Sequence, residues 1–188
     1  KPLSMMQGID STFQAAIFVG YHARMGTHGV LSHTISGAVV ANIWVNDILV
    51  GETGINAGLA GYFGVPVVLV TGDDVVCEEA KSLLPWVHTA TVKHAVNRNS
   101  AQCLPPERVK EVLRDATIRA LGDIKNAKPW LPASPVTFKV EFKDSGLQAN
   151  AARMPFVKEI DPRTLAFTAG DYLTALTGLR SMIALAAG

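Results

Sequence analysis

The chain lacks most of the features that assign a protein to a class by composition alone. It has only two cysteines in 188 residues, Cys77 and Cys103, which is too few for a disulfide framework. We expect two reduced, partly buried thiols, as is usual in the cytoplasm. It also lacks an excess of either charge, because 17 basic and 16 acidic side chains leave a net charge of +1. This balance argues against binding to nucleic acid or to an anionic membrane.

No hydrophobic run is long enough to cross a membrane. The most apolar stretch, residues 172–187, is shorter than the roughly 20 residues of a transmembrane helix and contains Arg180. We therefore expect a soluble, cytoplasmic protein. The opening KPLSMMQGID, whose first methionines are Met5 and Met6, reads like a loop in the middle of a chain. We expect further sequence to precede it.

The order of sequence patterns predicts an α/β fold. Continuous or alternating apolar runs predict strands, glycine- or alanine-rich and amphipathic segments predict helices, and Asn46-Asp47 between two β-branched runs predicts a tight hairpin. The expected strands are 15–23, 65–71, 88–96, 136–143 and 164–168, and the expected helices are 54–64, 75–84, one from Pro105-Pro106 to about residue 120, and 172–187. Alternating strands and helices indicate a mainly parallel sheet with flanking helices in residues 1–128. Residues 129–188 are expected to form a smaller C-terminal α+β lobe that mediates oligomerisation.

Histidine is scarce, but three of the five histidines lie within twelve residues, in GYHARMGTHGVLSHT. His22 follows a predicted buried strand, and ligands of parallel sheets bind beyond the carboxyl ends of the strands. A backbone carbonyl could equally satisfy a histidine in that position. His33 ends a glycine-rich loop that can fold back over His22, whereas His28 is expected to be a solvated loop residue.

Glu52 follows a strand and opens the glycine-rich helix, where a carboxylate also interacts favourably with the helix dipole. An imidazole from His22 and a carboxylate from Glu52 suit zinc. Two ligands are too few, because a catalytic zinc normally has three protein ligands and a two-metal site needs bridging carboxylates. Asp73 and Asp74 are candidates, but helix capping explains their position.

Three segments resemble one enzyme family: GYHARMGTHGVLSHT, VNDILVGETGINAGLAGYFGVPVVLVTGDD and TVKHAVNRNSAQCLPP. They are similar to the zinc-dependent D-aminopeptidases of the bacterial dipeptide-transport operon type. The resemblance implies a two-zinc aminopeptidase that cleaves small peptides with an N-terminal D-amino acid, such as D-Ala-D-Ala, and assembles from stacked rings into a decamer. It also implies that His22 and Glu52 are zinc ligands and that His33 is the catalytic residue.

The chain departs from the family in its metal site. In the family, an N-terminal Asp-x-Glu-Gly motif and a further histidine supply the remaining ligands and the first strand, and this sequence contains neither. It resembles the C-terminal two-thirds of the family. We therefore expect two zinc ions per subunit only in a longer protein.

Two other functions are open at this point. The chain could be a non-enzymatic α/β binding or assembly module, which should purify without stoichiometric metal. It could also be an amidase that acts on another small peptide-like substrate, in which case it would bind zinc but fail to release D-alanine from D-Ala-D-Ala.

The final helix predicts self-association. Apolar side chains run almost all the way round it, at Leu173, Leu176, Leu179, Ile183 and Leu185. A helix that is hydrophobic on every side needs cover on every side. We expect this helix and its lobe to contact other subunits.

Overall fold

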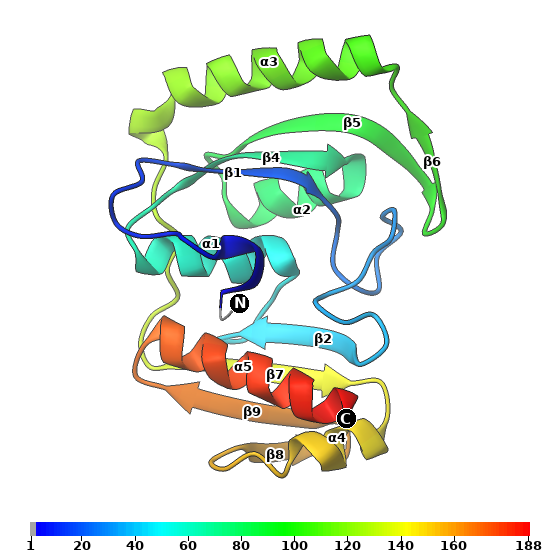
Figure 1. Cartoon of the computed structure of the whole chain (residues 1–188), viewed down its shortest axis with the longest axis vertical. Helices are drawn as coiled ribbons and strands as arrows, with labels where there is room; N and C mark the ends of the chain where they lie inside the picture. The colour runs from blue at the N-terminus through cyan, green and yellow to red at the C-terminus, as the bar shows by residue number, and fades with distance from the viewer. Residues whose placement is uncertain (1–2) are drawn as a thin grey trace.

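The computed structural model describes residues 3–188 and contains two β-sheets, one above the other in Figure 1, with helices between and around them. The strands are β1 Ala16–Tyr21, β2 Val40–Val45, β3 Ile48–Leu49, β4 Val67–Asp73, β5 His88–Asn97, β6 Ser100–Cys103, β7 Val136–Phe142, β8 Lys158–Asp161 and β9 Thr164–Ala169. The α-helices are α1 Glu52–Tyr62, α2 Asp74–Leu83, α3 Pro106–Gly122, α4 Ser145–Ala151 and α5 Tyr172–Ala187. Short 3-10 helices cover Ser4–Met6 and Ile124–Asn126.

Sheet A has the strand order β1-β4-β5-β6. β1, β4 and β5 are parallel, and β6 returns antiparallel to β5. Every residue of β4 is buried, as expected for a continuous apolar strand covered on both faces. The long helix α3 lies on one face of this sheet and α2 on the other (Figure 1). This confirms the predicted α/β fold with a mainly parallel sheet and flanking helices.

Sheet B is antiparallel, with the order β3-β2-β7-β9-β8. Its central strand β7 alternates buried and half-buried residues, which is the period of a strand with one face against the core. α5 packs against β7 and β9, and α4 packs against α5 (Figure 1). Sheet B and these two helices form the predicted α+β lobe.

The β2–β3 hairpin belongs to sheet B, although it precedes residue 128. Asn46 and Asp47 have φ values of 44° and 67°, the left-handed pair that a two-residue type I′ turn requires. The Asn46 side chain then accepts a hydrogen bond from the Thr137 backbone N–H at 2.8 Å, which ties the turn to the start of β7. The division between the sheets therefore does not coincide with the boundary predicted at residue 128. The division of the chain into two units stays a prediction. By sequence, β2 and β3 belong to the first predicted unit, but they lie in sheet B.

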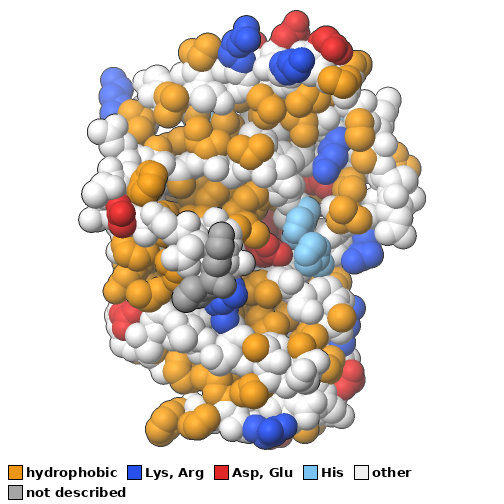
Figure 2. All heavy atoms as spheres, in the orientation of Figure 1, with side chains coloured by type: hydrophobic (Ala, Val, Ile, Leu, Met, Phe, Trp, Pro, Cys, Tyr) orange, Lys and Arg blue, Asp and Glu red, His pale blue; other side chains and the backbone are white. Residues whose placement is uncertain are grey.

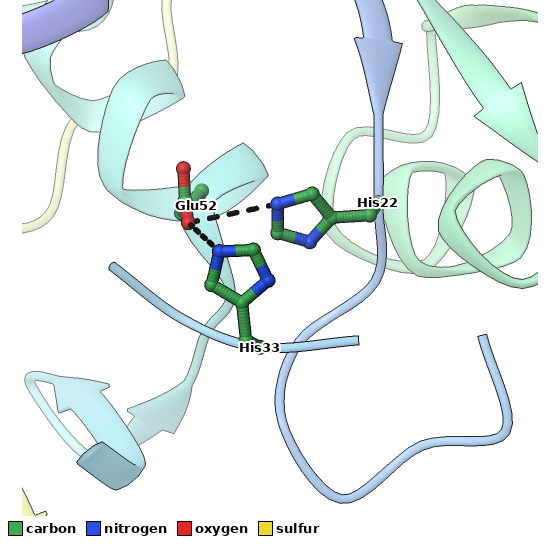
Figure 3. A group of neighbouring side chains, drawn as sticks. All are labelled: His22, His33 and Glu52. Carbon is green, nitrogen blue, oxygen red and sulfur yellow. Dashed lines mark ion pairs between the residues drawn. The ribbon is translucent and has the colours of Figure 1, made fainter. Parts of the chain in front are cut away.

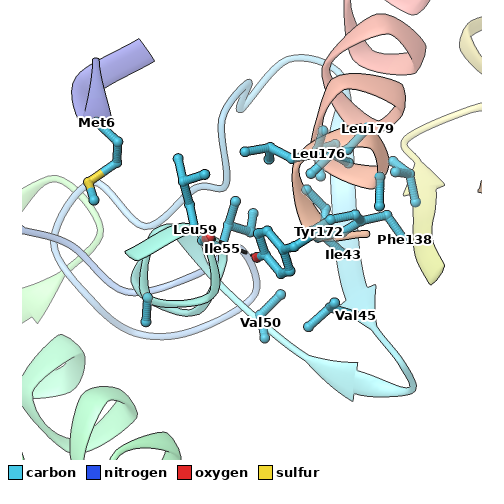
Figure 4. Packing of buried hydrophobic residues seen from close by; sticks show 14 of the residues in the cluster. Met6, Ile43, Val45, Val50, Ile55, Leu59, Phe138, Tyr172, Leu176 and Leu179 are labelled. Carbon is cyan, nitrogen blue, oxygen red and sulfur yellow. Dashed lines mark hydrogen bonds between the residues drawn. The ribbon is translucent and has the colours of Figure 1, made fainter. Parts of the chain in front are cut away.

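A single large core joins the two sheets. Figure 4 shows Tyr172 of α5 between Ile55 and Leu59 of α1 and Phe138 of β7. The Tyr172 hydroxyl donates a hydrogen bond to the Ile55 carbonyl at 2.8 Å. The side chain is thus buried without leaving its polar atom unpaired. This packing fixes α1, the helix that begins with Glu52, against the C-terminal lobe.

The apolar circumference of α5 is covered mostly by its own chain. Leu176, Leu179 and Ile183 are buried in the core, Leu173 is half-buried, and Leu185 is exposed at 37%. Sheet B, α1 and α4 thus cover most of this helix, and contact of the helix and its lobe with other subunits stays a prediction. No helix in residues 3–188 is long and apolar enough to span a bilayer.

Candidate metal centre

His22, His33 and Glu52 meet at the edge of sheet A where β1 ends. His22 directly follows β1, Glu52 is the first residue of α1, and His33 lies in the loop between β1 and β2. One ligand atom from each residue lies within 4.8 Å of those of the other two. Figure 3 shows both imidazole rings reaching towards the Glu52 carboxylate. Within the described part of the chain, no other histidine, cysteine or acidic residues form such a group.

Both imidazole rings direct their Nε2 atoms towards the Glu52 carboxylate. His22 Nδ1 lies 3.2 Å from the Ala23 carbonyl oxygen, and His33 Nδ1 lies 2.7 Å from the Leu31 carbonyl oxygen. A carbonyl oxygen only accepts hydrogen bonds, so a proton on each Nδ1 satisfies this contact and leaves Nε2 as the nitrogen that can bind a metal ion. Metal-binding histidines are oriented in this way by a hydrogen bond from the second ring nitrogen.

The spacing of these atoms fits a metal ion. His22 Nε2 and His33 Nε2 lie 3.7 and 3.8 Å from Glu52 Oε1, beyond ordinary hydrogen-bond length. The rings stack with centroids 4.1 Å apart. Two ligand atoms that bind the same zinc ion at about 2.0–2.2 Å in tetrahedral geometry lie about 3–4 Å apart. The donor types, nitrogen and carboxylate oxygen, are also those that zinc prefers.

Glu52 is held in place although it is almost fully buried, with 8% of the residue exposed. Its Oε1 accepts a hydrogen bond from the Ile35 backbone N–H at 2.9 Å. Its position in the first turn of α1 adds the favourable field of the helix dipole. The predicted dipole interaction and the predicted ligand role therefore apply to the same carboxylate.

Two acidic residues, one at the end of β4 and one on α2, hold the loop that carries His33. Asp73 caps α2 by accepting from the Val76 N–H at 2.8 Å, and its second oxygen accepts from the Val30 N–H at 2.6 Å. Glu79 of α2 accepts from the Arg24 N–H at 2.9 Å. The capping role predicted for Asp73 is confirmed, and the anchoring of the histidine loop is an additional role that the local sequence did not indicate.

The same loop contains backbone strain on both sides of His33. Leu31 and Ile35 have φ values of 53° and 62°, a region that is unfavourable for residues with bulky or β-branched side chains. The Ile35 conformation directs its N–H towards Glu52, and the Leu31 carbonyl receives the His33 ring. Such strain persists only where surrounding contacts determine the backbone, which is typical of functional sites.

A cavity of about 320 Å³ opens beside the three residues. Its walls come from the N-terminal segment, the histidine loop, α1 and α5, and include Asn56 and Arg180. Asn56 donates a hydrogen bond to the Tyr21 hydroxyl at 3.0 Å. Burial of the Tyr21 ring raises the pKa of its hydroxyl well above the usual value. Asn56 and Arg180 were not identified from the sequence, because α1 and α5 approach each other only in the fold.

The remaining candidates lie elsewhere. His28 is exposed in its loop and is not part of the group, as expected. Asp74 does not cap α2 but accepts a hydrogen bond from the Ala95 N–H at 2.9 Å, which lowers the pKa of its carboxyl. Both cysteines are free, with Cys77 buried and Cys103 exposed, so only one matches the partly buried thiols that we expected.

The fold and this group of residues indicate a class of protein. Two imidazoles and a carboxylate beside a cavity are the donor set of catalytic zinc sites in peptidases, and the edge beyond parallel strands is where such folds bind ligands. Three protein donors next to an open space fit a metal-dependent hydrolase better than a closed structural metal site.

Comparison with known proteins gives the family. Residues 1–181 match the Peptidase_M55 family, described as D-aminopeptidase, and the chain belongs to this family. It is 40% identical over 187 residues to the D-aminopeptidase of Bacillus subtilis (strain 168), covering 99% of this chain and 68% of that protein.

A solved structure agrees with this assignment. The fold matches the Zn-dependent D-aminopeptidase DppA from Bacillus subtilis, described as a self-compartmentalizing protease, with a TM-score of 0.96 and 39% identity. The match covers all of this chain and 68% of that one. The family resemblance and the expectation of a hydrolase, a zinc metallopeptidase, are thereby confirmed.

Proposed function

We propose that the protein is a two-zinc aminopeptidase that removes an N-terminal D-amino acid from small peptides such as D-Ala-D-Ala. The observation that carries this proposal is the group of His22, His33 and Glu52: the donor atoms of His22 and Glu52 lie together beside a cavity, and His33 Nε2 lies next to them. The family match supports the reaction class, and the zinc dependence of the similar Bacillus protein supports the metal.

His22 and Glu52 are the zinc ligands in this proposal. Both side chains are oriented by backbone hydrogen bonds, from His22 to the Ala23 carbonyl and from Ile35 to Glu52. Their donor atoms suffice for part of one coordination shell. A second ion needs further carboxylates, and the resemblance implies that an Asp-x-Glu-Gly motif and another histidine provide them in the family.

His33 is the proposed catalytic residue. Zinc, when bound, polarises the peptide carbonyl and makes water a better nucleophile near neutral pH. His33 is the more exposed of the two histidines, with 32% of its side chain accessible against 22% for His22, so it is the one that substrate reaches more easily. Imidazole exchanges protons near neutral pH, so His33 Nε2 can transfer a proton between water and the departing amine.

The proposal extends to assembly and location. The similar Bacillus enzyme is described as self-compartmentalizing, which supports a homo-oligomer. The finer expectation of a decamer of stacked rings, and the cytoplasmic location, stay predictions. The family match favours the enzyme over the non-enzymatic binding module. An amidase with a different substrate remains the alternative that the following experiment tests.

The test compares three histidine variants in the purified full-length protein. We expect His22→Ala to lose zinc and activity, because it removes a ligand. His33→Ala should keep its zinc but lose about 100-fold or more of its turnover of D-Ala-D-Ala, since it removes the general acid or base. His28→Ala is the matched control, because His28 is exposed in the same loop, and should behave as the wild type.

The outcomes separate the alternatives. Zinc loss in His33→Ala would make His33 a ligand instead of a proton carrier. Full zinc loading of the wild type without release of D-alanine would favour the amidase. A wild type that purifies with fewer than two zinc ions per subunit would reject the two-zinc site.

A further inference from the structure

The cavity beside the three site residues contains a cation that the proposed chemistry does not use. Besides the histidines, two charged side chains line it, Glu52 from α1 and Arg180 from α5. Arg180 lies one helical turn after Leu176, another lining residue, and residues four apart share a helix face. Figure 2 shows histidine and acidic surface side by side near the middle of one face of the molecule, with basic surface nearby.

Arg180 has no partner among the described residues. It forms no ion pair and donates no hydrogen bond within residues 3–188. The other arginines either donate to an oxygen or are exposed to solvent. Those that donate are Arg24, Arg98, Arg108 and Arg163, and the exposed ones are Arg114, Arg119 and Arg153. Arg180 combines half-burial, a cavity wall and a guanidinium without an acceptor.

A guanidinium in this position selects an anion. It offers five N–H donors in a planar fork that matches the two oxygens of a carboxylate. Glu52 is the only carboxylate that lines the cavity among residues 3–188, and the Ile35 N–H already occupies its Oε1. An incoming carboxylate near Arg180 therefore gains a charge-assisted pair of hydrogen bonds.

The size of the cavity limits the ligand. A volume of about 320 Å³ is at the lower end of the range of roughly 300–1,000 Å³ found for small-molecule sites. A short peptide is a zwitterion, with an amine at one end and a carboxylate at the other. If its amine end faces the proposed zinc ligands, the carboxylate is the group left to meet a cation on another wall.

We propose that Arg180 binds the C-terminal carboxylate of the substrate and so restricts the enzyme to short peptides with a free carboxyl end. This inference rests on the proposed aminopeptidase function and deepens it. Arg180 is a specificity residue and takes no part in the proton transfer assigned to His33.

The test uses two substrates that differ in one group, D-Ala-D-Ala and its C-terminal amide, with the zinc-loaded full-length protein. We expect Arg180→Gln to lower kcat/KM for D-Ala-D-Ala by about 10- to 100-fold, the range for losing hydrogen bonds to a charged group. The loss should be mainly in KM, kcat/KM for the amide should change less than threefold, and bound zinc should be unchanged. Arg180→Lys should recover part of the loss, because it keeps the charge without the fork.

Arg119→Gln is the matched control, since Arg119 is exposed on α3 and forms no ion pair within residues 3–188, and it should affect neither substrate. Equal losses on both substrates, no loss on either, or loss of zinc from Arg180→Gln would overturn the assignment while leaving the aminopeptidase intact. A zinc-loaded wild type that cleaves neither compound would reject the proposed function itself, and the role of Arg180 with it.

Discussion

At the scale of the residue, the position of the metal site depends on one carboxylate, that of Asp73, and on the backbone angles of Leu31 and Ile35. Asp73 connects the end of β4, the start of α2 and the histidine loop through two hydrogen bonds. Leu31 and Ile35 adopt left-handed backbone angles on either side of His33. The position of His33 thus depends on contacts made by residues that have no chemical role of their own.

The strain at Leu31 leads to a prediction about stability. Leu31 is 56% exposed with φ at 53°, so its side chain gains little from burial and its backbone is unfavourable. Asparagine tolerates this conformation, and Leu31→Asn should raise the free energy of unfolding by about 1 kcal/mol. Urea unfolding measures the change.

The control for Leu31→Asn is Leu121→Asn. Leu121 is similarly exposed, at 47%, but lies in α3, where asparagine is a poorer helix former. This control should be neutral or slightly destabilising. Equal effects of the two substitutions would show that strain at Leu31 does not limit stability.

Glu79 predicts a dependence of stability on pH. Burial raises the pKa of its carboxyl above the usual 4.5. The unfolded chain therefore releases this proton at lower pH than the folded chain. As the pH rises from about the unfolded value through the raised folded value, the contribution of Glu79 to the free energy of unfolding is lost.

The side chain of Glu79→Gln does not titrate, so this variant does not lose stability as the pH rises through that range. Its amide oxygen can still accept the hydrogen bond from the Arg24 backbone N–H. The difference in unfolding free energy, Glu79→Gln minus wild type, should therefore increase between the unfolded-state and folded-state pKa values of Glu79. Above that range the difference should stay constant. Denaturant unfolding from pH 4 upwards measures it, with Glu78→Gln, an exposed neighbour, as the control. A difference that does not change with pH would refute the raised pKa.

At the scale of the elements, α1 depends on close contacts that only glycine permits. A Cβ on Gly58 would overlap the hydroxyl and ring of Tyr172, which is buried and hydrogen-bonded to Ile55. Gly58 thus reflects how closely α5 approaches, while Gly61 lies against the backbone of Trp130. The contact also determines how α1, with Glu52 at its first turn, lies against the C-terminal lobe.

Gly58→Ala should therefore destabilise the protein by about 1–3 kcal/mol, the usual cost of overpacking a core. Gly122→Ala provides the contrast, because nothing lies within 4 Å of a Cβ at Gly122, the last residue of α3, and alanine is the better helix former by at most about 0.5–1 kcal/mol, the value for a helix interior. The two substitutions should change the thermal midpoint in opposite directions. A neutral Gly58→Ala would mean that Tyr172 moves aside without loss.

The elements that the sequence predicts are those with a clear hydrophobic pattern. β4 is continuously apolar and β7 alternates, and both lie where the patterns place them. β6 and β8 were not predicted, because nearly all their residues are exposed and a strand without a buried face has no period to detect. The hairpin at Asn46-Asp47 was predicted from its turn residues, but its sheet was not, because the partner β7 lies far along the chain.

The residues of the site also fall into those that the sequence pattern indicates and those that it does not. His22 and Glu52 could be identified because a ligand-type residue follows a strand or opens a helix, and His33 because of the histidine cluster. Arg180 and the anchoring contacts of Asp73 and Glu79 depend on segments that meet only after folding. A single sequence contains no local signal for such contacts.

At the scale of the whole molecule, self-association should use the surface that folding leaves apolar. In the C-terminal lobe this surface includes Phe156, 93% exposed, and Ile160 of β8, 47% exposed. If this lobe makes subunit contacts, Phe156→Asp should weaken assembly at micromolar concentration. Sedimentation velocity measures the change.

Phe13→Asp is the control on the other side of the molecule, next to β1, where Phe13 is 51% exposed. It should leave the assembly unchanged if the lobe supplies the contacts. A wild type that sediments as a compact monomer would reject self-association altogether. Loss of assembly in Phe13→Asp but not in Phe156→Asp would show that the subunit contacts lie on the side of sheet A.

The pairing of β2 with β7 also has a consequence for synthesis of the protein. Asn46 and Thr137, which join the hairpin to its sheet, are 91 residues apart. At about 5–20 residues per second, a ribosome needs roughly 5–20 s to make the intervening chain. During that time Ile43 and Val45, both fully buried at the end, have only the two-residue strand β3 beside them, and the open edge of β2 can associate with other nascent chains. Slower codons between β3 and β7 should therefore lower the yield of folded protein more than equally slow codons after β9.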